Sequence, residues 1–236
     1  MPAALITGAS RGIGAATARG FAAAGYDLLL VARASEEFTT LAAELRAMGR
    51  RVESLELDLA DPAAIEAGIG DLCARGLVPS VVINNAGAAW TGPLMAMPLE
   101  RWQWLLQLNL TAVFQVCRAV VPLLREQGGG LIIQVSSHAA RNAFADWGAY
   151  CTSKAALASF SRCLAEEERR YGIRVATLTL GSVNTPLWDS EGVSSGFDRR
   201  AMLSPDQAAS ALLYLAQQPS TQCVEDLTLM PAAGVF

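Results

Sequence analysis

The chain has 236 residues, of which 52% are hydrophobic and 17% are charged, and its formal net charge is −4. This composition excludes a disordered chain, a collagen-like repeat and a small disulfide-built scaffold, because none of those buries a large apolar core. The length suits one α/β domain, and charges of both signs are interspersed, so we expect no nucleic-acid partner.

Short apolar segments alternate along the chain with longer segments of helical periodicity. The predicted strands are Ala3–Thr7, Asp27–Ala32, Arg51–Leu57, Ser80–Asn84, Leu131–Ser136, Arg174–Thr179 and Asp226–Leu229. The predicted helices are Gly12–Ala24, Glu37–Met48, Pro62–Arg75, Leu99–Gln127, Ala149–Tyr171 and Pro205–Gln217. Strands that alternate with helices form βαβ units, so the pattern predicts an α/β fold with a doubly wound, mainly parallel sheet.

The ends of the predicted helices carry capping signals. Asp61-Pro62 supplies a cap and a first-turn proline, and Ser204 with Gln207 has the spacing of a capping box. Four glycines stand where helices should stop, namely Gly25, Gly49, Gly76 and Gly172. The segment 186–203 has a weak pattern, and in a single domain spanning residues 1–236 it predicts a lid or a substrate-binding loop.

A glycine-rich turn with the spacing G-x3-G-x-G joins the first predicted strand to the first helix. Glycine permits a tight turn and lets backbone N–H groups approach a phosphate at the positive end of a helix. The turn therefore predicts a dinucleotide site, although a glycine turn without a ligand is an alternative that the motif alone leaves open. The residues expected to bind the cofactor here are Gly8, Ser10, Arg11, Gly12, Ile13 and Gly14.

The end of the second predicted strand indicates which dinucleotide is bound. A site for NAD usually presents a carboxylate there to the ribose 2′-hydroxyl, whereas this chain has Val31-Ala32-Arg33. Together with Arg11 in the glycine turn, Arg33 offers charge-assisted hydrogen bonds to a 2′-phosphate. The two arginines predict a preference for NADP(H).

Tyr150 and Lys154 are spaced one helical turn apart, on the same face of a predicted helix. A free phenol has a pKa of about 10, which makes it a poor acid–base group near neutrality. A neighbouring ammonium stabilises the phenolate, so we expect Lys154 to lower the pKa of Tyr150. A lone Y-x3-K arises often by chance, and its interpretation depends on the other motifs.

Four motifs stand in order along the chain: Thr7–Gly14, Asn84–Gly87, Ser136-Ser137 and Tyr150-x3-Lys154. Their order and spacing resemble those of the short-chain dehydrogenase/reductase superfamily over essentially the whole chain. The resemblance implies a single Rossmann-type domain with a seven-stranded parallel sheet. It also implies a nicotinamide-dependent oxidoreductase in which a tyrosine is the acid–base group.

The resemblance assigns a catalytic set to four positions. Tyr150 matches the acid–base group, and Lys154 matches the residue that lowers its pKa and binds the nicotinamide ribose. Ser137 matches the serine that orients the substrate carbonyl, with Ser136 as the competing candidate. Asn109 matches the asparagine that holds a water in the proton relay.

The resemblance also implies further cofactor contacts, to adenine, along the wall of the cleft and to the nicotinamide carboxamide. The residues concerned are Asp58, Leu59, Asn85, Ala86, Gly87, Val183 and Thr185. Val183 would act through its backbone and Thr185 through its hydroxyl. The family usually has proline before the glycine at position 181, but this chain has Leu180, a departure that bears on the local backbone geometry.

These roles predict an NADPH-dependent reductase of a small ketone or aldehyde. Apolar residues expected around the substrate indicate a mainly apolar pocket, namely Phe144, Trp147, Leu187 and Trp188. A 3-oxoacyl-acyl-carrier-protein reductase is the second interpretation, but the basic patch frequent in that class is reduced here to Arg125, offset by Glu126. A pteridine reductase and a non-catalytic cofactor-binding sensor stay open as alternatives.

The remaining expectations concern metals, location and assembly. The five cysteines form no C-x2-C pair and there is one histidine, so we expect no metal site. With no leader segment and no uninterrupted apolar stretch of about 18 residues, we expect a cytoplasmic protein without membrane contact. The resemblance implies a homotetramer or homodimer built through the two longest helices, whose surplus apolar positions are Trp102, Leu105, Leu106, Val113, Leu157, Phe160 and Leu164.

Overall fold

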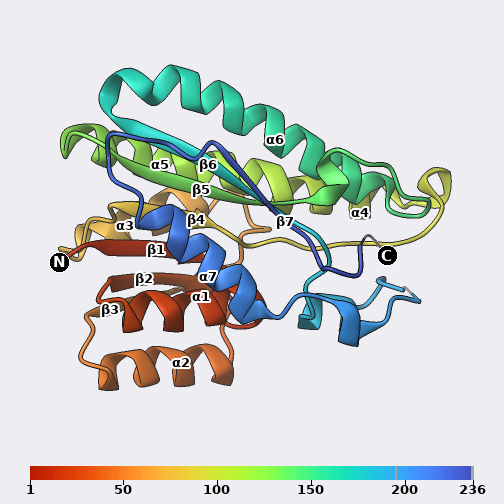
Figure 1. Cartoon of the computed structure of the whole chain (residues 1–236), viewed down its shortest axis with the longest axis horizontal. Coiled ribbons are helices and arrows are strands. Elements are labelled where there is room, and N and C mark those ends of the chain that lie inside the picture. The colour runs from red at the N-terminus through yellow and green to blue at the C-terminus, as the bar shows by residue number, and fades with distance from the viewer. Residues whose placement is uncertain (195, 235–236) are drawn as a thin grey trace.

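Seven strands form one sheet in the order β3-β2-β1-β4-β5-β6-β7, and every neighbouring pair is parallel (Figure 1). The structure, a computed structural model, describes residues 1–194 and 196–234. The strands are β1 (Ala3–Thr7), β2 (Asp27–Ala32), β3 (Val52–Glu56), β4 (Val81–Asn84), β5 (Gly130–Ser137), β6 (Ile173–Leu180) and β7 (Asp226–Leu229). The predicted doubly wound parallel sheet is therefore confirmed. Ser195, within the predicted loop, lies outside the described residues.

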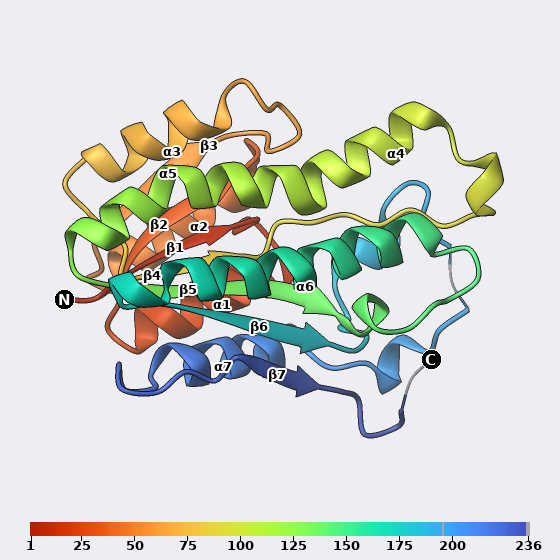
Figure 2. The ribbon, with the colours of Figure 1, turned by 90° about the horizontal axis from the view of Figure 1, so that it is seen from above.

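Helices cover both faces of the sheet (Figures 1 and 2). One face packs against α1 (Gly12–Ala23), α2 (Glu36–Ala47) and α7 (Pro205–Ala216). The other packs against α3 (Ile65–Ala74), α5 (Ala112–Glu126) and α6 (Gly148–Glu168). All six residues of β2 are buried, as expected of a parallel strand that is covered on both sides.

The third helix begins at Ile65, three residues later than predicted. The Asp58 carboxylate accepts a hydrogen bond from the backbone N–H of Ala60 at 2.9 Å, and Asp61 accepts one from Ala63 at 3.1 Å. Such local side-chain bonds compete with helix formation. The prediction that Asp61-Pro62 opens the helix was therefore wrong.

The predicted helix Leu99–Gln127 is divided into α4 (Leu99–Leu106), a π-helical turn (Gln107–Thr111) and α5. Single π turns inside helices are frequent at functional sites, and this one carries Asn109. By length and composition alone, residues 99–126 would be sufficient to cross a membrane. In this fold, however, α5 buries seven residues, most of them packed against the sheet, so core packing explains much of its apolar character.

The other helix ends follow the predicted signals closely. Ser204 and Gln207 form the capping box at the start of α7, and Gly25, Gly49, Gly76 and Gly172 all have positive φ. The predicted helix Ala149–Tyr171 ends instead at Glu168, and a short 3-10 turn over Arg169–Tyr171 follows. Glycine is required at such ends because the left-handed region is costly for other residues.

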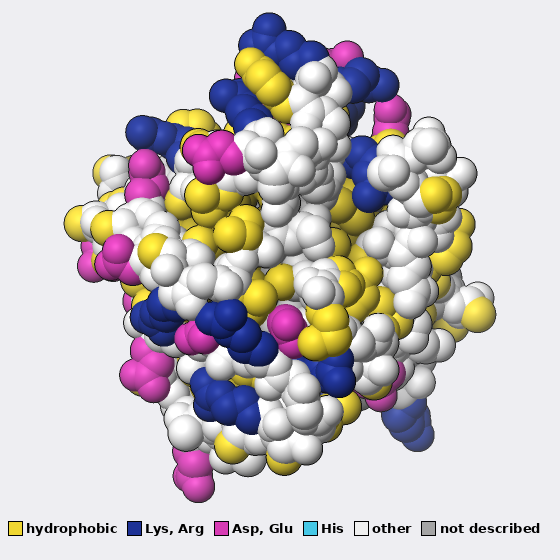
Figure 3. All heavy atoms as spheres, turned by 90° about the vertical axis from the view of Figure 1, so that its left-hand side faces the viewer, with side chains coloured by type: hydrophobic (Ala, Val, Ile, Leu, Met, Phe, Trp, Pro, Cys, Tyr) yellow, Lys and Arg dark blue, Asp and Glu magenta, His cyan; other side chains and the backbone are white. Residues whose placement is uncertain are grey.

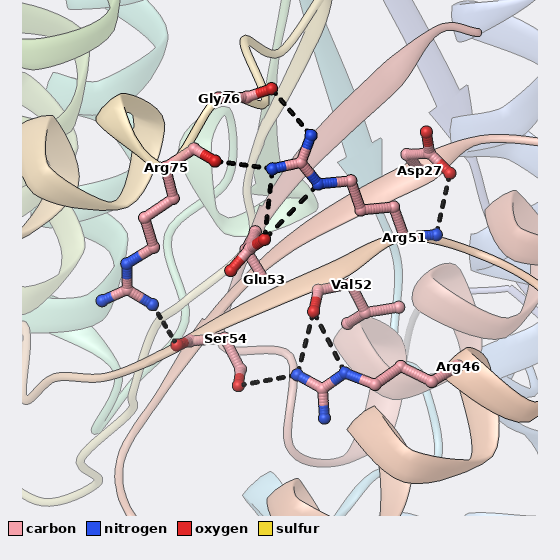
Figure 4. A network of polar contacts seen from close by, with 8 residues as sticks. All are labelled: Asp27, Arg46, Arg51, Val52, Glu53, Ser54, Arg75 and Gly76. Carbon is pink, nitrogen blue, oxygen red and sulfur yellow. Dashed lines mark hydrogen bonds and ion pairs between the residues drawn. The ribbon is translucent and has the colours of Figure 1, made fainter.

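A polar network lies at the amino ends of the strands, and Arg51 is at its centre (Figure 4). Its guanidinium donates to the carbonyls of Arg75 at 2.5 Å and Gly76 at 2.9 Å, which completes the C-terminal end of α3. Its backbone N–H donates to the Asp27 carboxylate at 3.0 Å. Figure 3 shows this end of the molecule, where basic and acidic side chains are interspersed.

Candidate active site

A cleft of about 640 Å³ opens at the carboxyl ends of the strands, between the loops that follow β1 and β4. The strand order reverses between these two strands, and ligands of doubly wound sheets bind at such a point. The loops after β2, β3, β5 and β6 and the start of α6 also contribute to its walls. The volume lies within the range of small-molecule and cofactor sites.

The glycine turn forms one end of the cleft. Gly8 and Gly12 have φ of +65° and +56°, and a Cβ at Gly14 would collide with the Gly8 carbonyl oxygen. The cleft is lined by five residues of the turn, namely Gly8, Ser10, Arg11, Gly12 and Ile13. Gly14 is buried behind them. The turn is thus a close-packed cradle in which backbone N–H groups at the start of α1 are available to a phosphate.

Asn85 fastens the loop after β4 to the glycine turn. Its side-chain amide donates to the carbonyls of Thr7 at 3.0 Å and Gly8 at 3.3 Å. The Thr7 hydroxyl in turn accepts from the backbone N–H groups of Asn85 at 3.0 Å and Ala86 at 3.1 Å. Asn85, Ala86 and Gly87 line the cleft as predicted, and these bonds hold the two loops in one arrangement.

Arg33, Asp58 and Leu59 line the cleft beyond the glycine turn, at the ends of β2 and β3. Across the described residues, neither Arg11 nor Arg33 forms an ion pair with a carboxylate. Both residues are exposed. Two cations not paired within the protein therefore flank one end of the cleft.

Tyr150 and Ser137 lie together at the opposite end of the cleft. Both side chains line the cleft, and Ser137 lies close enough to the phenol to lower the pKa of Tyr150. The Ser137 oxygen accepts a hydrogen bond from the backbone N–H of Ala139 at 3.2 Å. Ser136 lies on the cleft too, but its hydroxyl is buried and has no partner among the described residues. The geometry brings Ser137 to Tyr150 and favours it over Ser136.

The pKa of Tyr150 departs from the expected direction. Burial raises it above the ordinary phenol value, and the hydrogen bond to Ser137 opposes that rise. The Lys154 ammonium lies 5.8 Å from the centroid of the Tyr150 ring and donates to the Val135 carbonyl at 3.0 Å. The predicted lowering of the Tyr150 pKa is therefore wrong for this structure, because burial of the phenol is the largest influence on its pKa and raises it.

Lys154 is the single lysine of the chain, and burial lowers its pKa from 10.5 to about 8. We expect selective isotope labelling of lysine to give one side-chain resonance that titrates near pH 8. A midpoint above about 10, the value of a free lysine side chain, would contradict the burial of this ammonium. The Tyr150→Phe variant serves as a control, because Tyr150 is absent from the causes of the shift.

The same shift predicts how stability changes with pH. Below about pH 8, Lys154 is charged in both the folded and the unfolded state, and burial of its charge destabilises the fold. Between about pH 8 and 10.5, Lys154 is protonated only in the unfolded chain. The free energy of unfolding therefore rises with pH in this range. Lys154→Met should therefore be more stable than the wild type by about 1–3 kcal/mol near neutrality. Urea unfolding should show that the difference in free energy of unfolding between the variant and the wild type decreases toward about pH 10.

Asn109 is buried behind the cleft and connects three segments. Its amide oxygen accepts from the Ala88 N–H at 2.9 Å, and its amide nitrogen donates to the Ala88 carbonyl at 2.9 Å and the Ser153 hydroxyl at 3.0 Å. The side chain of Asn109, the residue expected to hold a relay water, is thus bonded to protein groups. It fixes the loop after β4 to α6 beside Lys154.

The segment after β6 lies over the glycine turn. Val183 and Thr185 line the cleft, and a Cβ at Gly12 would lie 3.3 Å from the Thr185 side chain. Leu180 stands where the family usually has proline, and it is the last residue of β6. It pairs with Ser137 of β5 and Leu229 of β7. A leucine keeps the N–H that proline lacks, so the strand continues without moving Val183 and Thr185 out of the cleft.

Comparison with known proteins agrees with this geometry. The family model described as short chain dehydrogenase matches residues 2–194. The chain belongs to the short-chain dehydrogenase/reductase family. It is 33% identical over 220 residues to the D-threitol dehydrogenase of Mycolicibacterium smegmatis, which covers 90% of this chain and 85% of that protein.

Two solved structures illustrate the likeness of this family member's fold. A metagenomic short-chain oxidoreductase in complex with NADP superposes with a TM-score of 0.85 at 33% identity, covering 98% of this chain and 97% of that one. An alcohol dehydrogenase from the archaeon Thermococcus sibiricus, complexed with 5-hydroxy-NADP, gives a TM-score of 0.89 at 30% identity with the same coverage.

Several residues of this short-chain dehydrogenase/reductase were missed by the sequence analysis. Thr7 and Ser153 lie inside the recognised motifs, but their roles depend on Asn85 and Asn109, which are distant in sequence. Arg101, Glu191 and Phe197 line the cleft from α4 and from the segment 186–203. No local pattern marks these three positions, because only the fold brings them to the cleft.

Proposed function

We propose that this protein is an NADP-dependent oxidoreductase that interconverts a small ketone or aldehyde and the corresponding alcohol. One observation carries the proposal: the cleft has Ser137, Tyr150 and the buried Lys154 at one end, and at the other Arg11 and Arg33, which form no ion pair with a carboxylate among the described residues. Two similar proteins are named for alcohol oxidation, and two similar structures hold NADP or a derivative of it. The catalytic constellation argues against a non-catalytic sensor.

The residues of the cleft fit a dinucleotide. The glycine turn leaves space and backbone donors for the pyrophosphate, while Arg11 and Arg33 suit the 2′-phosphate of NADP. We assign Asp58 and Leu59 to the adenine end, the turn 85–87 to the wall of the cleft, and the segment 183–185 to the carboxamide. When bound, the nicotinamide ring supplies or accepts a hydride at the carbonyl carbon.

The chain's own groups manage the proton. In reduction, the Tyr150 hydroxyl donates its proton to the carbonyl oxygen, and Ser137 donates a hydrogen bond to the same atom, so the developing charge is stabilised. A phenol whose pKa is raised by burial remains protonated near neutrality. Lys154 stabilises the phenolate that remains, and Asn109, whose side chain is occupied, can bind a relay water through its main chain.

The acyl-carrier-protein reductase is the second candidate, and Arg125 bears on it. The Arg125 guanidinium makes two hydrogen bonds to the Glu168 carboxylate, at 2.7 and 2.5 Å, and lies over the Tyr171 ring at 4.3 Å. The one arginine expected to meet an acidic carrier is therefore neutralised within the protein. This observation favours a small free substrate.

A screen of NADPH oxidation tests the proposal. Activated ketones, aromatic aldehydes, an acetoacetyl thioester and a dihydropteridine are supplied in turn, each with NADPH and with NADH. We expect turnover with a ketone or aldehyde and a higher kcat/KM with NADPH. Turnover restricted to the thioester or the pteridine would favour those alternatives, and no turnover with bound NADPH would favour a sensor.

We also propose a homodimer or homotetramer built through α4, α5 and α6, which lie on one side of the sheet (Figure 2). Leu105, Val113 and Leu157 are buried within the chain, contrary to the sequence analysis. Phe114 is 44% exposed, however, and packs edge-to-face with Phe160 at 6.2 Å. Phe114→Glu should lower the sedimentation coefficient, and a wild-type monomer at micromolar concentration would contradict the proposal.

The cellular location is a further proposal. All five cysteines are unpaired, the state that the reducing cytoplasm maintains. We infer that the protein acts there as one domain, with residues 186–203 as its substrate loop.

A further inference from the structure

A row of aromatic rings continues from Tyr150 along the cleft. Tyr150 and Trp147 lie 5.6 Å apart between centroids, Trp147 and Trp188 lie 5.6 Å apart, and Trp188 and Phe197 lie 5.5 Å apart. The interplanar angles are 73°, 62° and 75°, the edge-to-face arrangement that aromatic pairs prefer. All four rings line the cleft. Tyr150 belongs to α6, Trp147 stands directly before it, and the other two rings belong to the substrate loop. We call this row of four rings the aromatic wall.

Three polar side chains beside the aromatic wall are bonded within the protein. The Trp188 indole N–H donates to the Val183 carbonyl at 2.8 Å, so its one polar atom is satisfied. The Asp189 carboxylate accepts from Arg199 at 2.9 Å. A hydrogen bond of 2.8 Å joins the His138 ring to the Asn142 amide. The wall therefore offers a substrate mostly ring surfaces. The hydroxyls of a polyhydroxylated substrate would lose their hydrogen bonds to water there, and the wall would not replace them.

The substrate loop that carries Trp188 and Phe197 is bonded to the segment that follows β4. The Thr91 N–H donates to the Gly192 carbonyl at 2.7 Å, and the Thr91 hydroxyl accepts from the Ser194 N–H at 2.8 Å. A Cβ at Gly192 would lie 2.7 Å from the Trp90 ring, so the two segments touch closely. The rings of the loop are held in place before a substrate binds, which reduces the entropic cost of binding.

We propose that the substrate is an uncharged aromatic ketone or aldehyde, whose ring extends the row formed by Trp147 and Trp188 while its carbonyl oxygen meets Ser137 and Tyr150. This inference rests on the proposed function and names its substrate class. An aromatic contact is worth about 0.5–1.5 kcal/mol beyond the area it buries. Arg101 and Glu191 both line the cleft and have opposite charges. The cleft therefore favours neither a positively nor a negatively charged substrate.

Three ketones of similar size test the substrate class: phenyl methyl ketone, cyclohexyl methyl ketone and a four-carbon polyhydroxyketone. Each is reduced with NADPH under the same conditions, and kcat/KM is compared. We expect phenyl methyl ketone to exceed cyclohexyl methyl ketone by about ten-fold, the effect of one to two aromatic contacts. Equal values for the two, or a preference for the polyhydroxyketone, would overturn the inference.

Variants of Trp188 connect the preference to the aromatic wall. Trp188→Leu should reduce the phenyl-to-cyclohexyl ratio toward one, mainly through KM for the aromatic ketone, whereas Trp188→Phe keeps a ring and should retain most of the ratio. Tyr214→Leu, a change at a side chain 51% exposed on α7, should leave it unaltered. A ratio that survives in a folded Trp188→Leu protein would exclude Trp188 from aromatic recognition.

Failure of this inference is distinguishable from failure of the proposed function. If the screen of ketones and aldehydes gives turnover but the phenyl preference is absent, the reaction class stands and the aromatic substrate class falls. If every ketone and aldehyde is inert while NADPH binds, the proposed function itself falls and the substrate class with it.

Discussion

Tyr150→Phe is expected to lower kcat for carbonyl reduction by about 10²–10⁴-fold, the usual contribution of a positioned general acid. The change removes the phenolic oxygen that lies beside Ser137 and can donate a proton at the end of the cleft. The aromatic ring and its contact with Trp147 remain. Steady-state kinetics and NADPH binding by fluorescence titration separate the two effects, and we expect NADPH affinity to be unchanged.

Tyr171→Phe is the matched control for this prediction. Tyr171 follows α6 in a 3-10 turn and packs against Arg125 and Arg170, so loss of its hydroxyl should leave kcat unaltered. A Tyr150→Phe protein that keeps more than about a tenth of the wild-type kcat would place the acid elsewhere, because a positioned acid is worth more than that factor.

Arg33→Asp is expected to shift the ratio of kcat/KM for NADPH over NADH by about 100-fold toward NADH, on the scale of one hydrogen bond between charged groups. Arg33 lines the cleft without a carboxylate partner among the described residues. An aspartate there would repel a 2′-phosphate and accept a hydrogen bond from a ribose 2′-hydroxyl. Both cofactors are measured with one ketone.

Arg170→Asp makes the same charge change at an exposed position beyond the C-terminal end of α6. It should leave the cofactor ratio unaltered, which separates a local contact from the effect of net charge. Raising the salt concentration should reduce the wild-type preference for NADPH, because exposed charges are screened. An unchanged ratio in Arg33→Asp would remove Arg33 from recognition of the cofactor.

The aromatic wall illustrates a limit of reading the chain as a sequence. Trp147 and Trp188 were expected near the substrate, but the sequence gives no sign that their rings touch. Their edge-to-face contact, and the addition of Phe197, depend on how the substrate loop returns over α6. Because Thr91 fixes that loop from another part of the chain, no local pattern indicates the row.

Asn109 and Tyr150 show the same limit within the predicted site. The periodicity of residues 99–127 is helical throughout, and the π turn at Asn109 forms where its amide meets Ala88 and Ser153. The direction of the Tyr150 pKa depends on the burial of the ring, which the neighbouring lysine did not indicate. Both features arise from packing between distant segments.

By itself, the sequence determined the parallel sheet, the glycine turn and the placement of Tyr150 and Lys154 on one helical face, because strand periodicity, turn chemistry and helical spacing are local properties. The assignment of Ser137 came from the family resemblance, which left Ser136 as an alternative. Three strands, β1, β2 and β7, have the predicted bounds. Only the tertiary structure decided which apolar side chains are buried, which polar groups are already bonded and in which direction burial moves each pKa. Those properties depend on neighbours that are distant along the chain and adjacent only after folding.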